Sequence, residues 1–344
     1  MSRVKRLLKH VLPSSSIGKL NLWKNDIKLR LFAILSRSAR LSSLYYAVFP
    51  NSFAEEHQKV MLGFYAYHRD VPIMQGTQYK LRRNIHRLEK GLLMRPRRAI
   101  FALDYIEETL DSYEKSVLNC RDLEDSYSDG LRWAHDVLHA YFNAIASHPA
   151  IDQAKARFSG LPTVTTDGTR IPYRRNLAEP RPVSYNDLLE LSHRRKSVRW
   201  YSQQPVPRGL LDDAVSIASL APSACNRQPF EFRIFDDPEL VQRIAALPGG
   251  TQGFFHNFPV IVVIVGKLGA YFNERDRHLI YIDSALAAMA FMYALETLGL
   301  SSCALNWHGT AMEEDAMSAL LNLAPDEQVV MLVSAGYPDP EGLV

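Results

Sequence analysis

The segment 194–199 concentrates cations and one hydroxyl group where a helix is predicted to end. Its sequence, RRKSVR, contains four cationic side chains and a serine, namely Arg194, Arg195, Lys196, Ser197 and Arg199. Guanidinium groups bind phosphate oxygens in a forked geometry, and a hydroxyl adds a further donor. The segment therefore predicts an anion site if the chain turns there. The alternative interpretation is a cationic last helical turn that interacts with the helix dipole.

A polar loop follows at residues 221–230, with the sequence APSACNRQPF. Pro222 ends the preceding helix, and Pro229 fixes the entry into the next strand. Ser223 and Asn226 offer hydrogen bonds to a planar heterocycle, whereas Cys225 is better explained as a small apolar residue than as a reactive thiol. Taken alone, this segment is a loop between a helix and a strand.

The sequence lacks the motifs of several large enzyme classes. It contains no G-x-S-x-G, H-E-x-x-H, P-loop or G-x-G-x-x-G, so serine hydrolases, zincins, P-loop NTPases and Rossmann dehydrogenases are not supported. The glycine-rich stretch 249–253 lies between a predicted helix and a predicted strand and is interpreted as a turn. Cys120, Cys225 and Cys303 lie far apart without a C-x-x-C pair, so we expect no metal site.

The elements around these segments alternate between helix and strand in the C-terminal half. Helices are predicted at Tyr185–Arg195, Arg208–Leu220, Pro238–Leu247, Ile282–Leu298 and Glu313–Leu323. Strands are predicted at Phe230–Phe235, Val260–Val265, Ser302–Asn306 and Val329–Ala335. Val260–Val265 and Val329–Val333 are nearly continuous apolar runs, which is typical of strands buried on both faces. This half is therefore expected to be an α+β domain with helices on both sides of a short sheet.

The N-terminal half is predicted to be helical. Apolar residues recur at helical spacing in Phe53–Tyr67, Tyr79–Met94, Ala99–Leu118 and Asp129–Ile145. The segment Lys80–Arg98 is strongly basic opposite an apolar stripe, which indicates either a solvated helix face or an anion site for a phosphate or an acidic sugar. Between residues 151 and 183 the periodicity fades and turn residues gather, so this stretch is predicted to be a linker.

Charge is unevenly distributed along the 344 residues. The chain has a net charge of +3, but residues 1–50 carry ten Lys and Arg against a single acid, Asp26. A basic arm on a mildly acidic body predicts contact with an anionic surface near the N-terminus rather than nucleic-acid binding throughout. The first helix, Met1–Leu12, is basic and amphipathic and ends before Pro13 and a serine run; the alternative to membrane contact is packing on the protein body.

The two chemical segments, in this order and spacing, resemble the FMN-dependent nitroreductase family. That family has an R-x-S-x-R/K phosphate segment, a P-V pair near the next helix, here Pro205-Val206, and a P-S-x-x-N-x-Q-P loop, here Pro222 to Pro229. The resemblance covers about Tyr185 to Pro338. It implies an α+β nitroreductase-like fold, with a central, mostly antiparallel sheet flanked by helices, dimeric, and preceded by an all-α domain. The expected divisions are an arm (1–50), a helical domain (51–150), a linker (151–183) and an FMN-binding domain (184–344).

The resemblance also implies which residues bind the flavin. Arg195, Lys196, Ser197 and Arg199 would hold its phosphate, ribityl chain and pyrimidine edge, with Lys196 acting through its backbone. The ring-binding residues would be Pro222, Ser223, Ala224 and Asn226, mainly from the partner subunit, with Thr251 and Gln252 near the pyrimidine and Asn306 and Trp307 near flavin N5. In this family a Lys or Arg after the last strand commonly reaches the phosphate. Here seven residues follow Tyr337 and none is basic, so Arg194, Arg82 or Arg83 would substitute, or FMN would bind weakly.

The implied activity is an FMN-dependent oxidoreductase. Hydride would pass from NAD(P)H through FMN to a small organic acceptor in a ping-pong cycle, and no side chain would act as nucleophile or acid. The expected assembly is a homodimer with FMN at the subunit interface. One alternative is a non-catalytic nitroreductase-like dimer that serves as a membrane-surface or polysaccharide-pathway assembly protein, and another is an enzyme that consumes its own flavin. No nucleic-acid partner is expected, and the expected location is the cytoplasm, with possible peripheral contact at the inner membrane face.

Overall fold

The computed structural model describes residues 14–49, 53–69, 76–119 and 126–343. Two compact units divide the chain, Met1–Gln58 and Lys59–Val344, and each is described by itself. The expected helix at Met1–Leu12 and the residue Cys120 lie outside the described residues.

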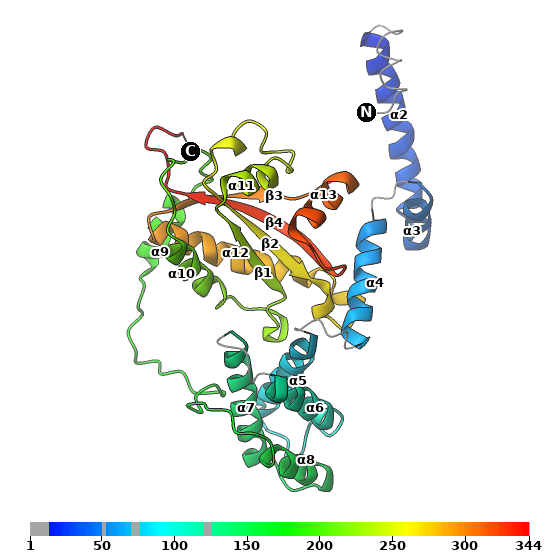
Figure 1. Cartoon of the computed structure of the whole chain (residues 1–344). Coiled ribbons are helices and arrows are strands. Elements are labelled where there is room, and N and C mark those ends of the chain that lie inside the picture. The colour runs from blue at the N-terminus through cyan, green and yellow to red at the C-terminus, as the bar shows by residue number, and fades with distance from the viewer. Residues whose placement is uncertain (1–13, 50–52, 70–75, 120–125, 344) are drawn as a thin grey trace. The chain divides into compact units, whose positions relative to one another are not determined.

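A four-stranded sheet forms the centre of the C-terminal domain (Figure 1). Its strands are β1 (Phe230–Phe235), β2 (Val260–Lys267), β3 (Ser301–Asn306) and β4 (Glu327–Gly336). They lie in the order β1-β2-β4-β3, and every neighbouring pair is antiparallel. The predicted α+β class with a mostly antiparallel sheet is therefore confirmed.

Strand β2 shows why the sheet is buried on both faces. Side chains alternate across a strand, and Val260, Val262 and Ile264 enter one hydrophobic core, whereas Ile261, Val263 and Val265 enter another. All six are essentially inaccessible to solvent. The nearly continuous apolar sequence of β2 thus follows from having a helical layer on each side.

Helices cover each face of the sheet in pairs (Figure 1). Helices α11 (Pro238–Ala245) and α13 (Ala311–Leu321) supply the core on one face. Helices α10 (Arg208–Ala218) and α12 (Leu279–Thr297) supply the core on the other, and α9 (Tyr185–Arg194) contacts α12. The predicted helices and strands of this domain lie within three residues of the observed bounds.

The helical domain has its own hydrophobic core. It contains α5 (Gly76–Leu93), α6 (Ile106–Asn119), α7 (Ser126–Ala144) and α8 (Pro149–Ser159). On α5 the buried side chains are Leu81, Ile85 and Leu88, which are three or four residues apart, as the apolar stripe predicted.

Two predictions in this domain were wrong. Helix α6 begins at Ile106 rather than Ala99, because residues 94–105 form a loop in which Ala102 has a φ of 71°. The stretch predicted as a linker begins with helix α8, whose Ile151 and Ala154 are buried in the domain core. Helix α8 is short, and its apolar residues were too few to stand out beside the turn residues that follow.

The described part of the N-terminal unit is helical. Helix α2 (Ser14–Leu35) includes the serine run before which the first helix was predicted to end, and α3 (Ala39–Val48) follows Ser38, whose side chain caps it. Helix α3 has no buried residue. Helix α4 (Ala54–Arg69) continues into the second unit, where Lys59 donates to Gln328 Oε1 at 2.7 Å.

One helical stretch in the described residues, Glu274–Thr297, is long and apolar enough to cross a membrane. Half of its most apolar window is buried inside the protein. This stretch contains α12, which packs on the sheet, so its apolar composition is that of a core helix.

Candidate functional site

The cationic segment 195–199 runs beside the edge strand β3. Helix α9 ends at Arg194 after starting with a capping box between Ser184 and Asp187. Ser197 then forms a parallel β-bridge with Ser302, and Val198 N donates to Ser302 O at 3.1 Å. Because Val198 is buried in the core, the flanking polar side chains are held at the surface.

The cations of the segment 195–199 and the adjacent Arg194 differ in their partners. Arg194 pairs with the buried Glu296 at 3.4 Å, and Arg199 donates to Ser197 O at 3.2 Å. Arg195 and Lys196 form no ion pair with any described residue. Arg195 and Lys196 therefore remain available for an external anion, while Arg194 already neutralises a carboxylate.

Asn306 and Trp307 lie at the far end of β3. Asn306 is exposed and contacts His308 Nδ1 at 3.1 Å, whereas the buried Trp307 donates its indole N–H to Glu314 Oε1 at 2.7 Å. Four residues of strand separate Asn306 from Ser302, which corresponds to roughly 13 Å. The predicted phosphate segment and the predicted N5 contact thus lie along one edge of the sheet, and Trp307 has a packing role there.

Thr251 and Gln252 use their side chains within their own loop. The buried Thr251 hydroxyl is 2.7 Å from both Ala245 O and Pro248 O, and Gln252 Nε2 donates to Ala246 O at 3.0 Å. The loop adjoins the cationic segment, since Arg199 lies 5.9 Å from the Phe254 ring. The flavin contact predicted for Thr251 and Gln252 stays a prediction, and the observed bonds give both residues a structural role.

The polar loop 222–229 has an unusual backbone. Cys225, Asn226 and Gln228 have φ values of 54°, 50° and 50°, in the left-handed region that non-glycine residues rarely adopt. Such conformations persist only where surrounding contacts hold them, and they gather at functional sites. Here Ala224 N donates to Asp283 Oδ2 at 3.0 Å, and Gln228 N donates to Ser223 Oγ at 3.0 Å.

A buried polar group beneath this loop was missed by the sequence analysis. Arg227, Tyr271 and Asp283 are each at most 3% exposed. The Arg227 guanidinium lies 5.3 Å from the Tyr271 ring centre, and Tyr271 donates to Asp283 Oδ2 at 3.3 Å. Burial raises the pKa of Asp283, while the bond from Ala224 N opposes the rise. No motif linked these three residues, because they come from separate elements.

The helical domain also reaches the loop. Arg82 of α5 donates to Asn226 O at 2.9 Å, while Arg83 stacks on the Phe272 ring at 4.1 Å. A cavity of about 890 Å³ lies against the loop. Its lining includes Pro222, Asn226, Arg227 and Gln228 from the loop and Gln78, Tyr79, Arg82 and Asp129 from the helical domain.

Within one chain, the two predicted parts of the flavin site do not meet. The loop ends just before Phe230 of β1, which pairs with Gly266 of β2, and Gly266 in turn pairs with Gln328 of β4. Ser197 pairs with Ser302 of β3, and Ser302 in turn pairs with Ala335 of β4. Seven residues of β4 and four strand spacings, the last from β3 to Ser197, correspond to roughly 23 Å along the strands and roughly 19 Å across them. The same separation keeps Arg82, which touches the loop, away from Arg195.

In the part of the chain that the structure describes, no three His, Cys, Asp or Glu side chains gather where they could hold a metal ion.

Comparison with known proteins shows which family the C-terminal domain resembles. Residues 193–337 match the model of the nitroreductase family. A Thermus thermophilus protein named NADH dehydrogenase is 27% identical over 180 residues, covering 43% of this chain and 85% of that protein. Iodotyrosine deiodinase 1 of Rattus norvegicus is 33% identical over 180 residues, covering 44% of this chain and 62%, less than two thirds, of that protein.

Solved structures give matches over the same part of the chain. An FMN-dependent nitroreductase from Clostridium difficile R20291 matches with a TM-score of 0.40 and 24% identity, covering 44% of this chain and 88% of that one. The family match spans the cationic segment, the polar loop and all four strands. Residues 193–337 of the chain thus form a nitroreductase-family domain.

Proposed function

We propose that this protein is an FMN-dependent oxidoreductase that transfers hydride from NAD(P)H to a small organic acceptor. The observation that carries the proposal is the pairing of a cationic segment, in which Arg195 and Lys196 have no internal ion pair, with a strained polar loop in one nitroreductase-family domain. The names of several relatives, NADH dehydrogenase among them, support the donor.

The donor set fits the phosphate end of FMN. Arg195, Lys196, Ser197 and Arg199 are surface groups beside β3, and all of them can donate to a phosphate. No acidic side chain makes an ion pair with Arg195, Lys196 or Arg199 among the described residues, so an incoming anion has no internal carboxylate to displace. These residues would hold the phosphate, and Asn306 would lie toward the ring.

The loop fits a planar ring. Pro222, Ser223, Ala224 and Asn226 present small apolar and polar groups, and the strained backbone is held by Asp283 from below. When bound, FMN supplies the hydride chemistry. The residues of the chain bind and orient it, and no side-chain nucleophile is needed, which agrees with the missing catalytic motifs.

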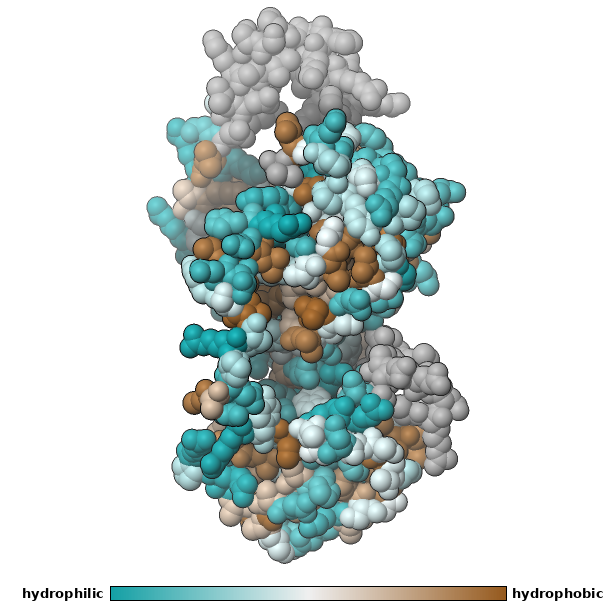
Figure 2. Space-filling model, turned by 90° about the vertical axis from the view of Figure 1, so that its left-hand side faces the viewer, coloured by the Kyte–Doolittle hydropathy of each residue, from teal (hydrophilic) through white to brown (hydrophobic). Residues whose placement is uncertain are grey.

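A second copy of the chain is part of this proposal. The cationic segment and the loop are too far apart in one chain to share one flavin, so the loop would come from the partner. Helices α9, α10 and α12 and the turn after α10 expose apolar side chains that fit such an interface: Leu188, Leu189, Ile217, Leu220, Ile282 and Leu286. Figure 2 shows apolar side chains interrupting the polar surface on the side that carries α9 and α10.

The test is the spectrum of the purified full-length protein. We expect a yellow protein with flavin absorption bands, bleached by NADH or NADPH without oxygen and restored by an acceptor. The extracted flavin should be intact FMN, because degraded flavin after reduction in air would favour the alternative in which the enzyme consumes it. Colourless protein that does not take up added FMN would contradict the proposal and favour a non-catalytic dimer.

The N-terminal unit supports a separate proposal about location. Its helices expose Trp23, Leu29, Ile34, Leu44 and Val48, and α3 buries none of its residues. Together with the basic arm, this surface fits peripheral contact with an anionic membrane. Co-sedimentation with phosphatidylglycerol vesicles tests this proposal: the full chain should bind, and a chain lacking residues 1–50 should remain in the supernatant.

A further inference from the structure

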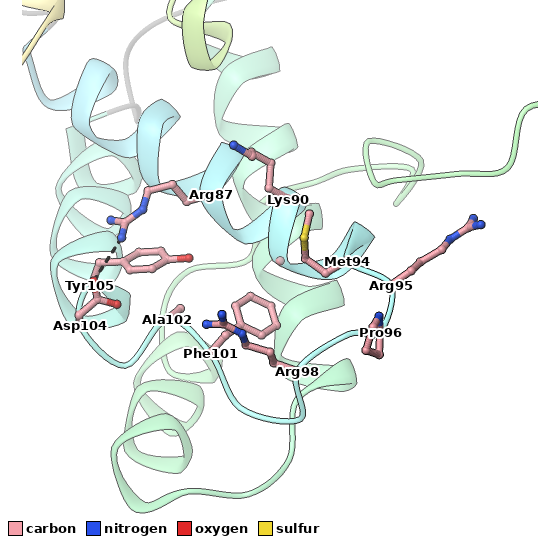
Figure 3. A pocket seen from close by; sticks show the side chains of 11 residues that line it. Arg87, Lys90, Met94, Arg95, Pro96, Arg98, Phe101, Ala102, Asp104 and Tyr105 are labelled. Atoms are coloured by element: carbon pink, nitrogen blue, oxygen red, sulfur yellow. Dashed lines mark hydrogen bonds and ion pairs between the residues drawn. The ribbon is translucent and has the colours of Figure 1, made fainter. Parts of the chain in front are cut away.

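A second cavity lies wholly within the helical domain, away from the flavin-binding residues. It is formed by the last turns of α5 and by the loop 94–105 that leads to α6 (Figure 3). Its volume is about 630 Å³, which is in the range of small-molecule sites.

The cavity depends on close packing between α5 and the loop. A Cβ atom at Gly91 would lie 2.1 Å from the ring of Phe101, so only glycine allows this ring to lie against the helix. Helix α7 and the residues just after it also hold the loop: Tyr141 of α7 donates to Phe101 O at 2.7 Å, and Ala146 N, beyond the end of α7, donates to Ala99 O at 2.9 Å. The aromatic wall of the cavity is therefore built into the domain.

Positive charge dominates the lining. Four cations contribute to it, namely Arg87, Lys90, Arg95 and Arg98, against one acid, Asp104. That acid is already engaged, since Asp104 Oδ2 lies 3.2 Å from Arg87 Nη2 while the Arg87 guanidinium stacks 3.5 Å from the Tyr105 ring. Among the described residues, no acid forms an ion pair with Lys90 or Arg98.

The cationic side chains of the lining point in different directions. In Figure 3, the Arg98 side chain extends beside the Phe101 ring, and Arg87 extends along Tyr105, whereas Arg95 points away from the other side chains. Arginine next to an aromatic ring presents a flat surface on which a planar group can stack, with its forked donors toward an anion. Arg98 and Phe101 thus combine the two functions in one place.

We propose that this cavity binds a small ligand that carries two or more phosphate groups and a planar ring. Lys90 and Arg98, which form no ion pair among the described residues, lie in one lining with Arg87 and its partner Asp104, and this leaves a net positive field that a single carboxylate would not balance. The apolar groups beside them, Met94 and Phe101, would cover the ring. This site is independent of the flavin, so it stands or falls separately from the proposed oxidoreductase activity.

The test uses calorimetric titration of the full-length protein with ADP, inorganic pyrophosphate and adenosine as probes. We expect ADP to bind more tightly than pyrophosphate, and adenosine to bind least. Arg98→Glu should weaken ADP binding by about tenfold or more, because it removes a charge-assisted bond and adds repulsion. Arg97→Glu is the matched control, since Arg97 is the adjacent exposed cation, carries the same charge and does not line the cavity.

Further variants separate the parts of the site. Phe101→Leu should weaken ADP binding but not pyrophosphate binding, and Lys90→Glu, a change on an exposed helix face, should repeat the effect of Arg98→Glu without altering the melting temperature. Arg195→Ala should leave ADP binding unchanged, which distinguishes this cavity from the flavin phosphate site. Equal loss in Arg97→Glu and Arg98→Glu, or absence of binding by both ADP and pyrophosphate at millimolar concentration, would overturn the proposal. Binding to phosphatidylglycerol vesicles that depends on Arg98 while ADP does not bind would also overturn it.

Discussion

The two parts of the candidate flavin site, the segment 195–199 and the loop 222–229, differ in what they could contribute to binding. The segment 195–199 offers charge: its backbone is held by β3, and Arg195 and Lys196 have no partner inside the described chain. The loop 222–229 offers shape: its polar groups are bonded within the protein, and its backbone is fixed in left-handed conformations. A charged ligand bound at the proposed site would therefore meet cations without an internal ion pair at one end and a preformed surface at the other.

The largest expected effect comes from disrupting the proposed dimer, which would separate the cationic segment of one subunit from the loop of its partner. Leu286→Glu on α12 places a charge on the apolar surface proposed for the partner subunit, where Leu286 is 45% exposed. We expect a monomer that retains little or no flavin, measured by light scattering coupled to gel filtration and by absorbance. Met312→Glu is the control, because Met312 is exposed on α13 over the other face of the sheet. A flavin-loaded monomer of Leu286→Glu would show that one chain suffices.

The next effect concerns the charged part alone. Arg195→Ala should weaken FMN binding by about tenfold to a hundredfold, the expected loss for one or two charge-assisted bonds. Arg194→Ala should instead lower the melting temperature, since it leaves the buried Glu296 without its cation, and should change FMN affinity less. Fluorescence titration with FMN distinguishes the two variants. If both lose FMN equally, the distinction between the paired and unpaired arginines fails.

The conformation of the loop 222–229 depends on the Asp283 carboxyl group, which accepts a hydrogen bond from the loop. Asp283→Ala removes the acceptor for Ala224 N and should lower the free energy of unfolding by about 1–3 kcal/mol, since a buried donor is left unsatisfied. Chemical denaturation measures this loss. Asp283→Asn keeps an acceptor and should lose much less, so an equal loss in both variants would contradict the role of the Ala224 bond.

The same position predicts a pH dependence. Burial raises the pKa of Asp283 above its unfolded value, so folding favours the protonated acid. Its contribution to stability is full below the unfolded pKa and is lost as pH rises through the folded pKa. Asp283→Asn does not titrate, so its stability relative to the natural protein should increase as the pH rises above about 3.9, the ordinary pKa of an Asp side chain. Asp213→Asn, on the exposed side of α10, controls for loss of a surface carboxylate, and a flat difference for Asp283→Asn would refute this account.

The smallest effect tests support from the helical domain. Arg82→Ala removes the bond to Asn226 O and should destabilise the loop by about 1 kcal/mol. Hydrogen exchange should be faster in residues 222–229 and unchanged in β2. Arg132→Ala, which removes an exposed pair with Asp129 on α7, is the control. Unchanged exchange in the loop would show that Arg82 does not hold it.

Much of the fold was predictable because both domains follow simple periodicities of apolar residues. The apolar run Val260–Val265 is β2 because both faces are covered, and the stripe Leu81, Ile85 and Leu88 is the buried side of α5. Helix α8 was missed because its short apolar pattern relies on tertiary burial of Ile151 and Ala154.

The site was predictable only in part, because sequence shows charge but not partners. The motif gave Arg195 and Ser197 as candidates, but it did not reveal that Arg194 belongs to Glu296 or that Thr251 bonds its own loop. The group formed by Arg227, Tyr271 and Asp283 left no local signal, since burial and not spacing joins them.

The contact between Gly91 and Phe101 makes these two positions dependent on each other. A side chain at position 91 would force the ring at position 101 out of its present place, because the first Cβ atom would already overlap the ring. Across related chains that share this helical domain, the two positions should therefore vary together, with a small residue at 101 wherever 91 is not glycine. That covariation would separate the relatives that retain an aromatic wall at this place from those that have filled it.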